Sequence, residues 1–357
     1  MKEPSLVSIA GEDRQFLCKP DEYLLDAALR SGLRLAHHCR GGACGTCKAD
    51  ILEGAVDHGW VMSFAISDQE KAEGKCLLCV SRPASPRMMV RPHARIGDSA
   101  VGFSSSPAEH EATIVASHLL SPRLRAIRLA LPAATSFRFD AGQHVELIVD
   151  DATARPYSIA EAPDDKGKAP QGLLTFYVSR HEGGQASTWL HEDAHVGRAF
   201  RLRGPYGAYC APPPVESQIV MLAGGSGLAP LLSLARCFLA KGHQGSVNLL
   251  FSLRSPAEVF ALDELVALQA RNANFSFALC LTQTAATDLP NGWRSGRIPG
   301  LLERSAATLS ATRVFIAGSP AFVAACSAAA LAHGAAQSDI WTEAYAFRLP
   351  TQAAESQ

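Results

Sequence analysis

The hydrophobic pattern changes character along the chain, which predicts several domains rather than one. Near the N-terminus, a strand-like run around Val7 is followed by a helix capped by Asp21 and ended by Gly32. This helix is indicated by apolar residues that fall on one face, namely Leu24, Leu25, Ala28 and Leu29. After a cysteine-rich loop, "KADILEGAVDHG" predicts a strand and a turn, and "KCLLCVSRPASPRMMVRP" predicts one buried strand that runs into proline.

The pattern differs in the second half of the chain. From residue 111 to about 214, short apolar runs such as "FRFDAGQHVELIVD" alternate with Gly, Pro and Asp turns, and helical patterns are scarce. This alternation predicts a small antiparallel barrel. Beyond a proline-rich hinge at residues 211–216, strand and helix patterns follow one another repeatedly, which predicts a parallel sheet covered by helices.

We therefore predict a domain at residues 1–95, a polar linker at 96–110, a barrel at 111–214, an α/β domain at 215–350 and a tail at 351–357. A length of 357 residues with 47% hydrophobic residues is sufficient for several cores. The net charge of −1 gives no reason to expect nucleic acid or a membrane as the partner. Because no signal peptide or spanning segment is readable, we expect a soluble, cytoplasmic protein.

The cysteines supply the first chemical signal. Cys39, Cys44 and Cys47 have the spacing C-x4-C-x2-C, and Cys79 is available as a fourth ligand. This spacing is typical of the plant-type ferredoxin site for a 2Fe-2S cluster. The glycines among the cysteines fit a chain that wraps a cluster closely and directs backbone N–H groups at its sulfur atoms.

Two alternatives accompany this prediction. The loop could hold zinc, which usually shows two separated cysteine or histidine pairs, or it could carry unpaired thiols. Cys76 also competes with Cys79 for the fourth position, and since the two are three residues apart on a predicted strand, only one can be a ligand. The other cysteines and the two neighbouring histidines are interpreted as packing or surface residues: Cys18, Cys210, Cys237, Cys280, Cys326, His37 and His38.

Three short motifs then occur in order: "RPYS" at residues 155–158, "GGQAS" at 183–187 and "GPYGAY" at 204–209. Together they resemble the ferredoxin-NADP reductase superfamily. The order of the modules resembles the single-chain reductase components of bacterial Rieske-type aromatic ring-hydroxylating dioxygenases. The resemblance implies a multidomain α+β and α/β protein with a β-grasp ferredoxin domain, an antiparallel flavin-binding barrel and a parallel-sheet nicotinamide-binding domain. It also implies a 2Fe-2S cluster, FAD and NADH as cofactors, and a terminal oxygenase as the partner.

The resemblance also implies roles for single residues. Within the first motif, Tyr157 is expected to flank the flavin ring and Ser158 to hydrogen-bond near the flavin N5 atom. Arg155 is expected to neutralise the pyrophosphate, and Pro156 is counted among the cofactor contacts. The second motif is expected to bind the same phosphates through Gly183, Gly184 and Ser187. In this family the last iron ligand ends an apolar triplet such as "LLC", which selects Cys79.

One position departs from the family pattern. Many relatives carry an arginine directly after the valine that precedes "GG", and this chain has Ser179 there, with Arg180 one place later. An alternating strand turns Arg180 to the other face, so we leave it out of the site.

The nicotinamide site is predicted at "GGSGLAP", between a strand and a helix. Its glycines allow a pyrophosphate to approach a helix N-terminus, and the alternative is a tight structural turn. The expected contacts are Gly224, Gly225, Gly227 and Pro230. Downstream, Gly318 lies in "AGSP", where Ala317 replaces the family's cysteine.

The choice of dinucleotide and the last aromatic contact come from the C-terminal half. A 2′-phosphate needs local Arg or Lys, and Arg254 is followed by an acidic stretch, which favours NADH. In "TEAYAF", Glu343, Tyr345 and Phe347 match a segment that approaches the flavin in relatives, and we select Tyr345 as the contact.

The modules together predict conversion of a two-electron donor into single electrons, with Tyr157, Ser158 and Tyr345 nearest the chemistry. A reductase for a di-iron monooxygenase or a deoxysugar dehydratase remains an alternative, because such systems use the same modules. A redox-sensing or docking subunit without turnover is the alternative from another class.

Overall fold

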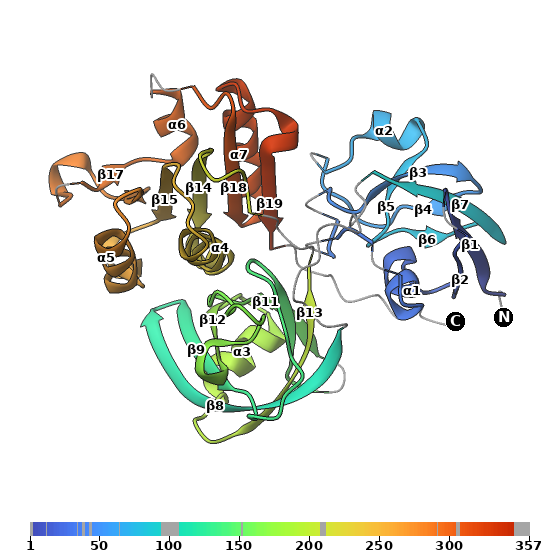
Figure 1. The fold of residues 1–357 in the computed structure, drawn as a ribbon, viewed down its shortest axis with the longest axis horizontal. Coiled ribbons are helices and arrows are strands. Elements are labelled where there is room, and N and C mark those ends of the chain that lie inside the picture. Colours follow the sequence, from blue (N-terminus) through green and yellow to red (C-terminus); the bar gives the residue numbers. More distant parts are fainter. Residues whose placement is uncertain are drawn as a thin grey trace. The chain divides into compact units, whose positions relative to one another are not determined.

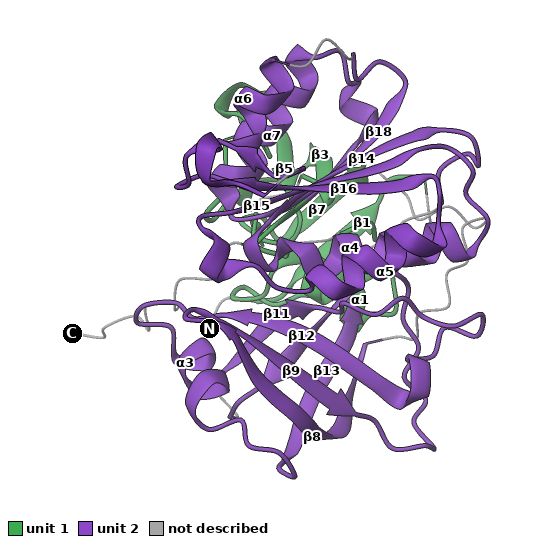
Figure 2. Ribbon diagram, turned by 90° about the vertical axis from the view of Figure 1, so that its left-hand side faces the viewer, with its two compact units in different colours: residues 1–97, 343–357 green, residues 98–342 purple. Residues whose placement is uncertain are grey.

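The computed structural model describes residues 3–345 except 12, 34, 38, 39, 43, 44, 64, 94–106, 151, 152, 208–211, 291 and 305–307. Its contacts divide the chain into two compact units, residues 1–97 with 343–357, and residues 98–342 (Figure 2). Within the described parts of the chain, no helix is long and apolar enough to cross a membrane.

The first unit is built on a mixed sheet with the strand order β2-β1-β7-β3-β5 (Figure 1). The strands are β1 (Ser5–Ile9), β2 (Gln15–Cys18), β3 (Lys48–Glu53), β5 (Lys75–Leu77) and β7 (Arg87–Pro92), with β4 (Val56–Asp57) and β6 (Arg82–Pro83) forming a separate pair. β1 runs parallel to β7, and the other pairs are antiparallel. The helices are α1 (Leu24–Arg30) and α2 (Asp68–Ala72). The sheet and the apolar face of α1 share one buried core, as a β-grasp domain requires.

Two local predictions in this unit need correction. The helix α1 begins at Leu24, not after a cap at Asp21, because residues 19–22 form a turn in which the Glu22 N–H donates to Lys19 O. Its end is as predicted, since Gly32 has a left-handed φ of +79° behind the last turn. The predicted single strand from residue 75 is instead three short ones, β5, β6 and β7, because prolines and a turn interrupt it.

The second unit begins with a six-stranded antiparallel sheet in the order β11-β10-β13-β8-β9-β12. Its strands are β8 (Ala108–Ser121), β9 (Leu124–Ala130), β10 (His144–Ile148), β11 (Ala154–Ser158), β12 (Leu173–Ser179) and β13 (Ala199–Tyr206). The helix α3 (Gln185–Glu192) and the 3-10 turn η1 (Pro170–Gly172) complete it. The edge strands β11 and β12 also contact each other, as in a barrel. β8 starts three residues inside the predicted linker, because its pairing with β13 extends to Ala108.

From β14 onward the chain forms a six-stranded sheet in the order β17-β16-β15-β14-β18-β19, in which β14–β15, β14–β18, β15–β16 and β16–β17 pair in parallel. Its strands are β14 (Gln218–Gly224), β15 (Val247–Leu253), β16 (Phe275–Leu281), β17 (Arg294–Ser295), β18 (Thr312–Gly318) and β19 (Ile340–Ala344). The helices are α4 (Leu228–Ala240), α5 (Leu262–Arg271), α6 (Ile298–Glu303) and α7 (Pro320–Ala332), with 3-10 turns η2 (Gly225–Gly227), η3 (Pro256–Glu258), η4 (Ala286–Asp288) and η5 (Gln337–Asp339). α4 and α5 lie on one face of the sheet, and α6 and α7 on the other (Figure 2). The predicted antiparallel and parallel sheets are therefore both confirmed.

Candidate functional site

The described part of the cysteine loop brings two predicted iron ligands into neighbouring positions. Cys47 and Cys79 are 3% and 1% exposed. β3 pairs with β5, and directly beyond that pairing the N–H of Leu78 donates to Cys47 O at 3.1 Å. Cys79 therefore directly follows Leu78, the residue that is hydrogen-bonded to Cys47. Cys39 and Cys44 lie outside the described residues, so their ligation stays a prediction.

Glycines allow this loop to pack closely against the following segment. A Cβ on Gly42 would lie 2.5 Å from the carbonyl oxygen of Trp60, and one on Gly45 would lie 3.2 Å from that of Ala65. Both glycines also have φ values near +75°, which side chains disfavour. Two buried thiols beside a loop that needs glycine at two positions fit the small, thiolate-bound 2Fe-2S group.

Cys76 occupies a different environment from Cys79. It lies within β5 opposite Ala49 of β3 and is fully buried in the core of the first unit. Cys79 instead lies in the turn that follows β5. This placement supports Cys79 as the fourth ligand and Cys76 as a packing residue.

The first flavin motif lies at the end of the sheet order as the edge strand β11, which pairs with β10. An edge strand tolerates Pro156, which has no N–H to donate and is exposed. Arg155 and Tyr157 alternate with it and lie on one face, opposite Leu147 and Val145 of β10. This face offers a ring and a guanidinium side by side, as an aromatic cofactor with a pyrophosphate requires.

The side chains of this motif have distinct surroundings. Burial raises the pKa of Tyr157 above its usual range, so its phenol stays neutral. The Arg155 guanidinium donates to the carbonyl of Ala154 at 2.8 Å. Ser158, the last residue of the strand, is 6% exposed.

The second flavin motif forms the N-terminal turn of α3. Gly183 has a φ of +71°, and a Cβ there would have no other atom within 4 Å, which leaves open space in front of the helix. Ser187 Oγ donates to Gly184 O at 3.1 Å and accepts from the N–H of His181 at 3.1 Å. The hydroxyl thus holds the turn, and its predicted contact with a phosphate stays a prediction. The first N–H groups of α3 face the space in front of the helix, as an anion site needs.

Ser179 stands where many relatives carry an arginine, and Arg180 follows it. The contacts of both residues agree with leaving Arg180 out of the flavin site. Arg180 forms an exposed ion pair with Glu192 at the other end of α3, which agrees with leaving it out of the site. Ser179 Oγ donates to Ser226 Oγ at 3.0 Å, and Ser226 lies within "GGSGLAP". The antiparallel sheet is therefore bonded directly to the loop at residues 224–230, which we call the glycine loop.

The glycine loop joins β14 to α4 and owes its shape to close backbone contacts. A Cβ on Gly227 would lie 2.1 Å from the carbonyl oxygen of Ala317, and a Cβ on Gly224 would lie 2.9 Å from the ring of Phe322. Gly225 has a φ of +55° and open space beside it. Pro230 is buried in the first turn of α4, where its missing N–H costs nothing.

The loop lies at the topological switch point of the parallel sheet. The chain leaves β14 toward β15 on one side, whereas β18 pairs with β14 on the other. Ligands of such sheets bind in the crevice at the carboxyl ends of these two strands. Gly318 ends β18 there, and a Cβ on it would lie 3.3 Å from Gly224 Cα. Ala317 is fully buried, so the position of the family's cysteine carries packing.

Arg254, the one cation predicted near the ribose, already has a partner. It follows β15 and forms an ion pair with Glu258 through its guanidinium, and its own N–H donates to Glu258 Oε2 at 3.1 Å. A 2′-phosphate would meet this carboxylate, which supports the expectation of NADH.

The C-terminal aromatic segment is described up to Tyr345. This residue follows β19 and is partly buried, and Glu343 in the strand is 4% exposed. Phe347 lies outside the described residues. The contact of Tyr345 with the flavin stays a prediction.

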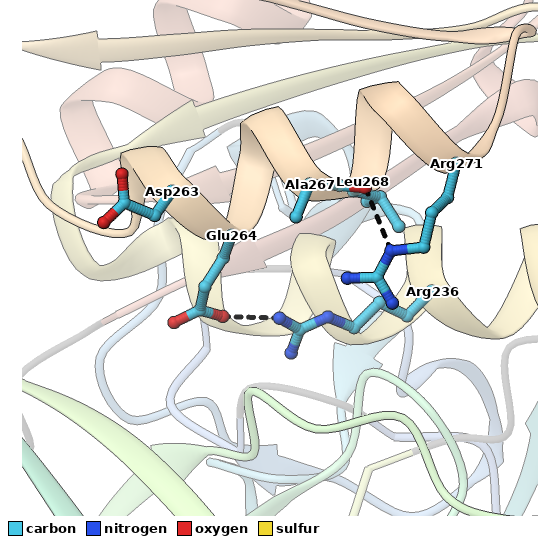
Figure 3. Close-up of a pocket in the computed structure, with 6 residues that line it drawn as sticks. All are labelled: Arg236, Asp263, Glu264, Ala267, Leu268 and Arg271. Atoms are coloured by element: carbon cyan, nitrogen blue, oxygen red, sulfur yellow. Dashed lines mark hydrogen bonds and ion pairs between the residues drawn. The ribbon is translucent and has the colours of Figure 1, made fainter.

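A hollow of about 370 Å³ between α4 and α5 lies apart from these positions (Figure 3). None of the predicted site residues lines it. Sequence reasoning missed one polar residue of α4, Ser233, which is fully buried in a largely apolar helix. The signal for it was a lone hydroxyl within "LAPLLSLARCFLA".

Three protein families match the chain in the order that the motifs predict. The 2Fe-2S iron-sulfur cluster binding domain matches residues 7–84, the oxidoreductase FAD-binding domain residues 111–210, and the oxidoreductase NAD-binding domain residues 221–328. The predicted cofactors, a 2Fe-2S cluster, FAD and NAD, are thereby confirmed at the level of the domains.

Similar proteins match most of the chain. The reductase component of propane 2-monooxygenase from Gordonia sp. (strain TY-5) is 30% identical over 97% of this chain and 98% of its own length. The reductase subunit of an aromatic O-demethylase from Amycolatopsis sp. (strain ATCC 39116 / 75iv2) is 33% identical over 77% of this chain and 80% of its own. Among solved structures, an Amycolatopsis cytochrome P450 reductase is 29% identical with a TM-score of 0.76, over 96% of this chain and 98% of its own.

Proposed function

Since the chain belongs to the reductase components of oxygenase systems, with a 2Fe-2S domain joined to FAD-binding and NAD-binding oxidoreductase domains, we propose that it passes electrons from NADH to a terminal oxygenase component. The observation that carries this proposal is the hydrogen bond of 3.0 Å between Ser179 and Ser226. It ties the sheet with the flavin motif to the loop with the dinucleotide motif inside one compact unit. Direct transfer between two bound cofactors needs such a fixed arrangement.

The module boundaries follow the same reasoning. We place the ferredoxin domain at residues 1–95, the FAD domain at 111–214 and the NAD domain at 215–350. Each family match falls inside one of these ranges, which supports the division.

The residues of the chain supply binding and orientation. A bound FAD would supply acceptance of a hydride from the nicotinamide, and a bound cluster would supply transfer of single electrons. Arg155 and the N-terminus of α3 are assigned to the pyrophosphate of FAD, while Tyr157 and Ser158 orient its ring. The glycine loop and Gly318 receive the dinucleotide at the sheet crevice. Cys47 and Cys79, with Cys39 and Cys44, hold the iron. No side chain is needed to move a proton for hydride transfer.

The class of acceptor is the finer part of the proposal. The sequence favours the terminal oxygenase of an aromatic ring-hydroxylating dioxygenase system. The names of the relatives, a propane 2-monooxygenase and an aromatic O-demethylase, favour a monooxygenase or demethylase acceptor instead.

Anaerobic titration of the purified holoprotein with NADH tests the donor side. We expect the flavin and cluster absorption bands to bleach together, and bands that do not change would reject the reductase function. Mixing the reduced protein with purified oxygenase components of each class then tests the acceptor side. The component that reoxidises it rapidly, in preference to the others, identifies the class.

A further inference from the structure

The helix α4 contacts both predicted cofactor sites. Its N-terminus lies at the glycine loop, and its middle contacts the antiparallel sheet that carries the flavin motifs. It begins at the glycine loop, and it packs against loops of the antiparallel sheet in Figure 2. Leu124 and Tyr177 of that sheet, with Ala141 and Ala160 of its loops, belong to the same buried apolar cluster as the helix. The two parts are therefore packed together as one core.

Ser233 forms the central polar contact of this packing. Its hydroxyl donates to the carbonyl of Glu161 at 2.5 Å and accepts from the N–H of Gly142 at 3.3 Å. The side chain is fully buried, so loss of its hydroxyl would remove both hydrogen bonds from a site that water does not reach. Gly142 has a φ of +82°, and a Cβ there would lie 3.2 Å from Leu234, which shows how closely its loop approaches α4.

Arg236, one turn further along α4, makes a second contact with the same segment. Its guanidinium donates to the carbonyl of Ala160 at 3.3 Å and also forms an ion pair with Glu264 of α5. Figure 3 shows Arg236 reaching from α4 to Glu264, which holds the guanidinium from the other side. Two neighbouring carbonyls of the segment that follows β11 are thus hydrogen-bonded to one face of α4.

The segment that accepts these bonds follows the flavin motif directly. Glu161 lies three residues after Ser158, and the segment is fixed from behind by β12. The N–H of Thr175 donates to Glu161 Oε2 at 2.6 Å, and the N–H of Ala160 donates to Thr175 O at 3.1 Å. The segment cannot shift without disturbing either β12 or α4.

We propose that Ser233 and Arg236 are positioning residues that hold the glycine loop in register with the flavin strand for hydride transfer. The inference rests on the proposed function, because it assumes that the two motifs bind FAD and NADH. Neither residue belongs to the predicted binding motifs, so their loss leaves the cofactor contacts intact. It alters instead the distance between the rings, on which the hydride-transfer rate depends steeply.

The test compares Ser233→Ala and Arg236→Met with the wild-type holoprotein by anaerobic stopped-flow reduction with NADH. Ser327→Ala is the matched control, because Ser327 also lies within a helix of the parallel-sheet domain and its buried hydroxyl has no partner among the described residues. We expect the limiting rate of flavin reduction to fall about 10- to 100-fold in the Ser233 variant. The flavin content and the affinity for NAD⁺, measured by calorimetric titration, should stay within about twofold. Arg236 is partly exposed, so its variant keeps the test valid if the Ser233 variant does not fold.

A spectroscopic readout separates positioning from general stability. The long-wavelength absorption of a nicotinamide stacked on the flavin should weaken in both variants and persist in Ser327→Ala. Unchanged reduction rates in both variants, a loss confined to NAD⁺ affinity, or an equal loss in the control would each overturn the inference. A wild-type flavin that NADH does not reduce would reject the proposed function, and the inference with it. A wild-type flavin that is reduced beside variants with unchanged rates would reject the inference alone.

Discussion

The preference for NADH over NADPH can be tested at the ion pair that follows β15. Glu258 accepts from the guanidinium of Arg254 and, at 3.1 Å, from its backbone N–H. A 2′-phosphate on the ribose would face this carboxylate and compete with it for the arginine. We therefore expect Glu258→Gln to raise kcat/KM for NADPH and to leave that for NADH nearly unchanged.

The exposure of the pair sets the size of the effect. Two unit charges 4 Å apart interact by about 4 kcal/mol at an effective dielectric constant of about 20 and by about 1 kcal/mol in water. The side chains of Arg254 and Glu258 are 48% and 20% exposed, so solvent screens them substantially. We expect a change of about 1–2 kcal/mol, which is about 5- to 30-fold in the ratio of the two kcat/KM values.

Steady-state kinetics with ferricyanide as the electron acceptor measure this ratio without an oxygenase. Glu192→Gln is the matched control, because Glu192 also pairs with a half-exposed arginine, Arg180, but in the antiparallel-sheet domain. An unchanged ratio in Glu258→Gln, or the same change in Glu192→Gln, would refute the reasoning. The dinucleotide ribose would then bind away from the end of β15.

Three further predictions concern the other sites. Cys79→Ser should lose bound iron, whereas Cys76→Ser should keep it, as iron analysis of the purified variants will show, and equal iron contents would contradict the assignment of the fourth ligand. Gly227→Ala should abolish NAD⁺ binding or folding, because its Cβ would lie 2.1 Å from a carbonyl oxygen of β18. Gly225→Ala should lower the free energy of unfolding by only about 1–2 kcal/mol, the cost of the left-handed backbone. Similar thermal unfolding midpoints for the two variants would argue against the close contact. Burial raises the pKa of the Cys280 thiol from 9.0 to about 12, so its contribution to stability is complete below about pH 9 and is lost as the pH rises toward 12. Cys280→Val should lessen the fall of the unfolding midpoint over this range, and an identical pH profile would exclude the thiol as a cause.

The sequence predicts the sheets well because each type of sheet has its own local pattern of apolar residues and turns. Repeated strand and helix patterns between residues 218 and 332 specify a parallel sheet, and short runs between turns specify an antiparallel one. Helix and strand limits are less visible. Asp21 has the chemistry of a cap, but the turn at residues 19–22 places the helix start at Leu24, and such a preference depends on contacts beyond the local pattern.

The predicted site shows the same division. "RPYS", "GGQAS" and "GGSGLAP" are contiguous motifs, so the residue types that meet one cofactor can be identified from the chain alone. Ser233 could not be assigned in this way, because its partners are backbone groups of Gly142 and Glu161, which any residue type could supply. A hydrogen bond to a distant main chain leaves no signal in the sequence of the acceptor.

Ser179 is visible in the sequence as a changed motif position, and the structure shows the contact that it makes. In the sequence it is a departure from the family pattern, a serine where many relatives carry an arginine. In the structure its hydroxyl reaches Ser226 in the glycine loop at 3.0 Å, so the smaller side chain allows the two motifs to approach each other. A long, charged arginine would fill the space that this short bond requires. The residue that weakens the match to the flavin motif therefore contributes to the contact between the flavin and nicotinamide domains, and binding within each site and alignment between the sites are carried by different residues.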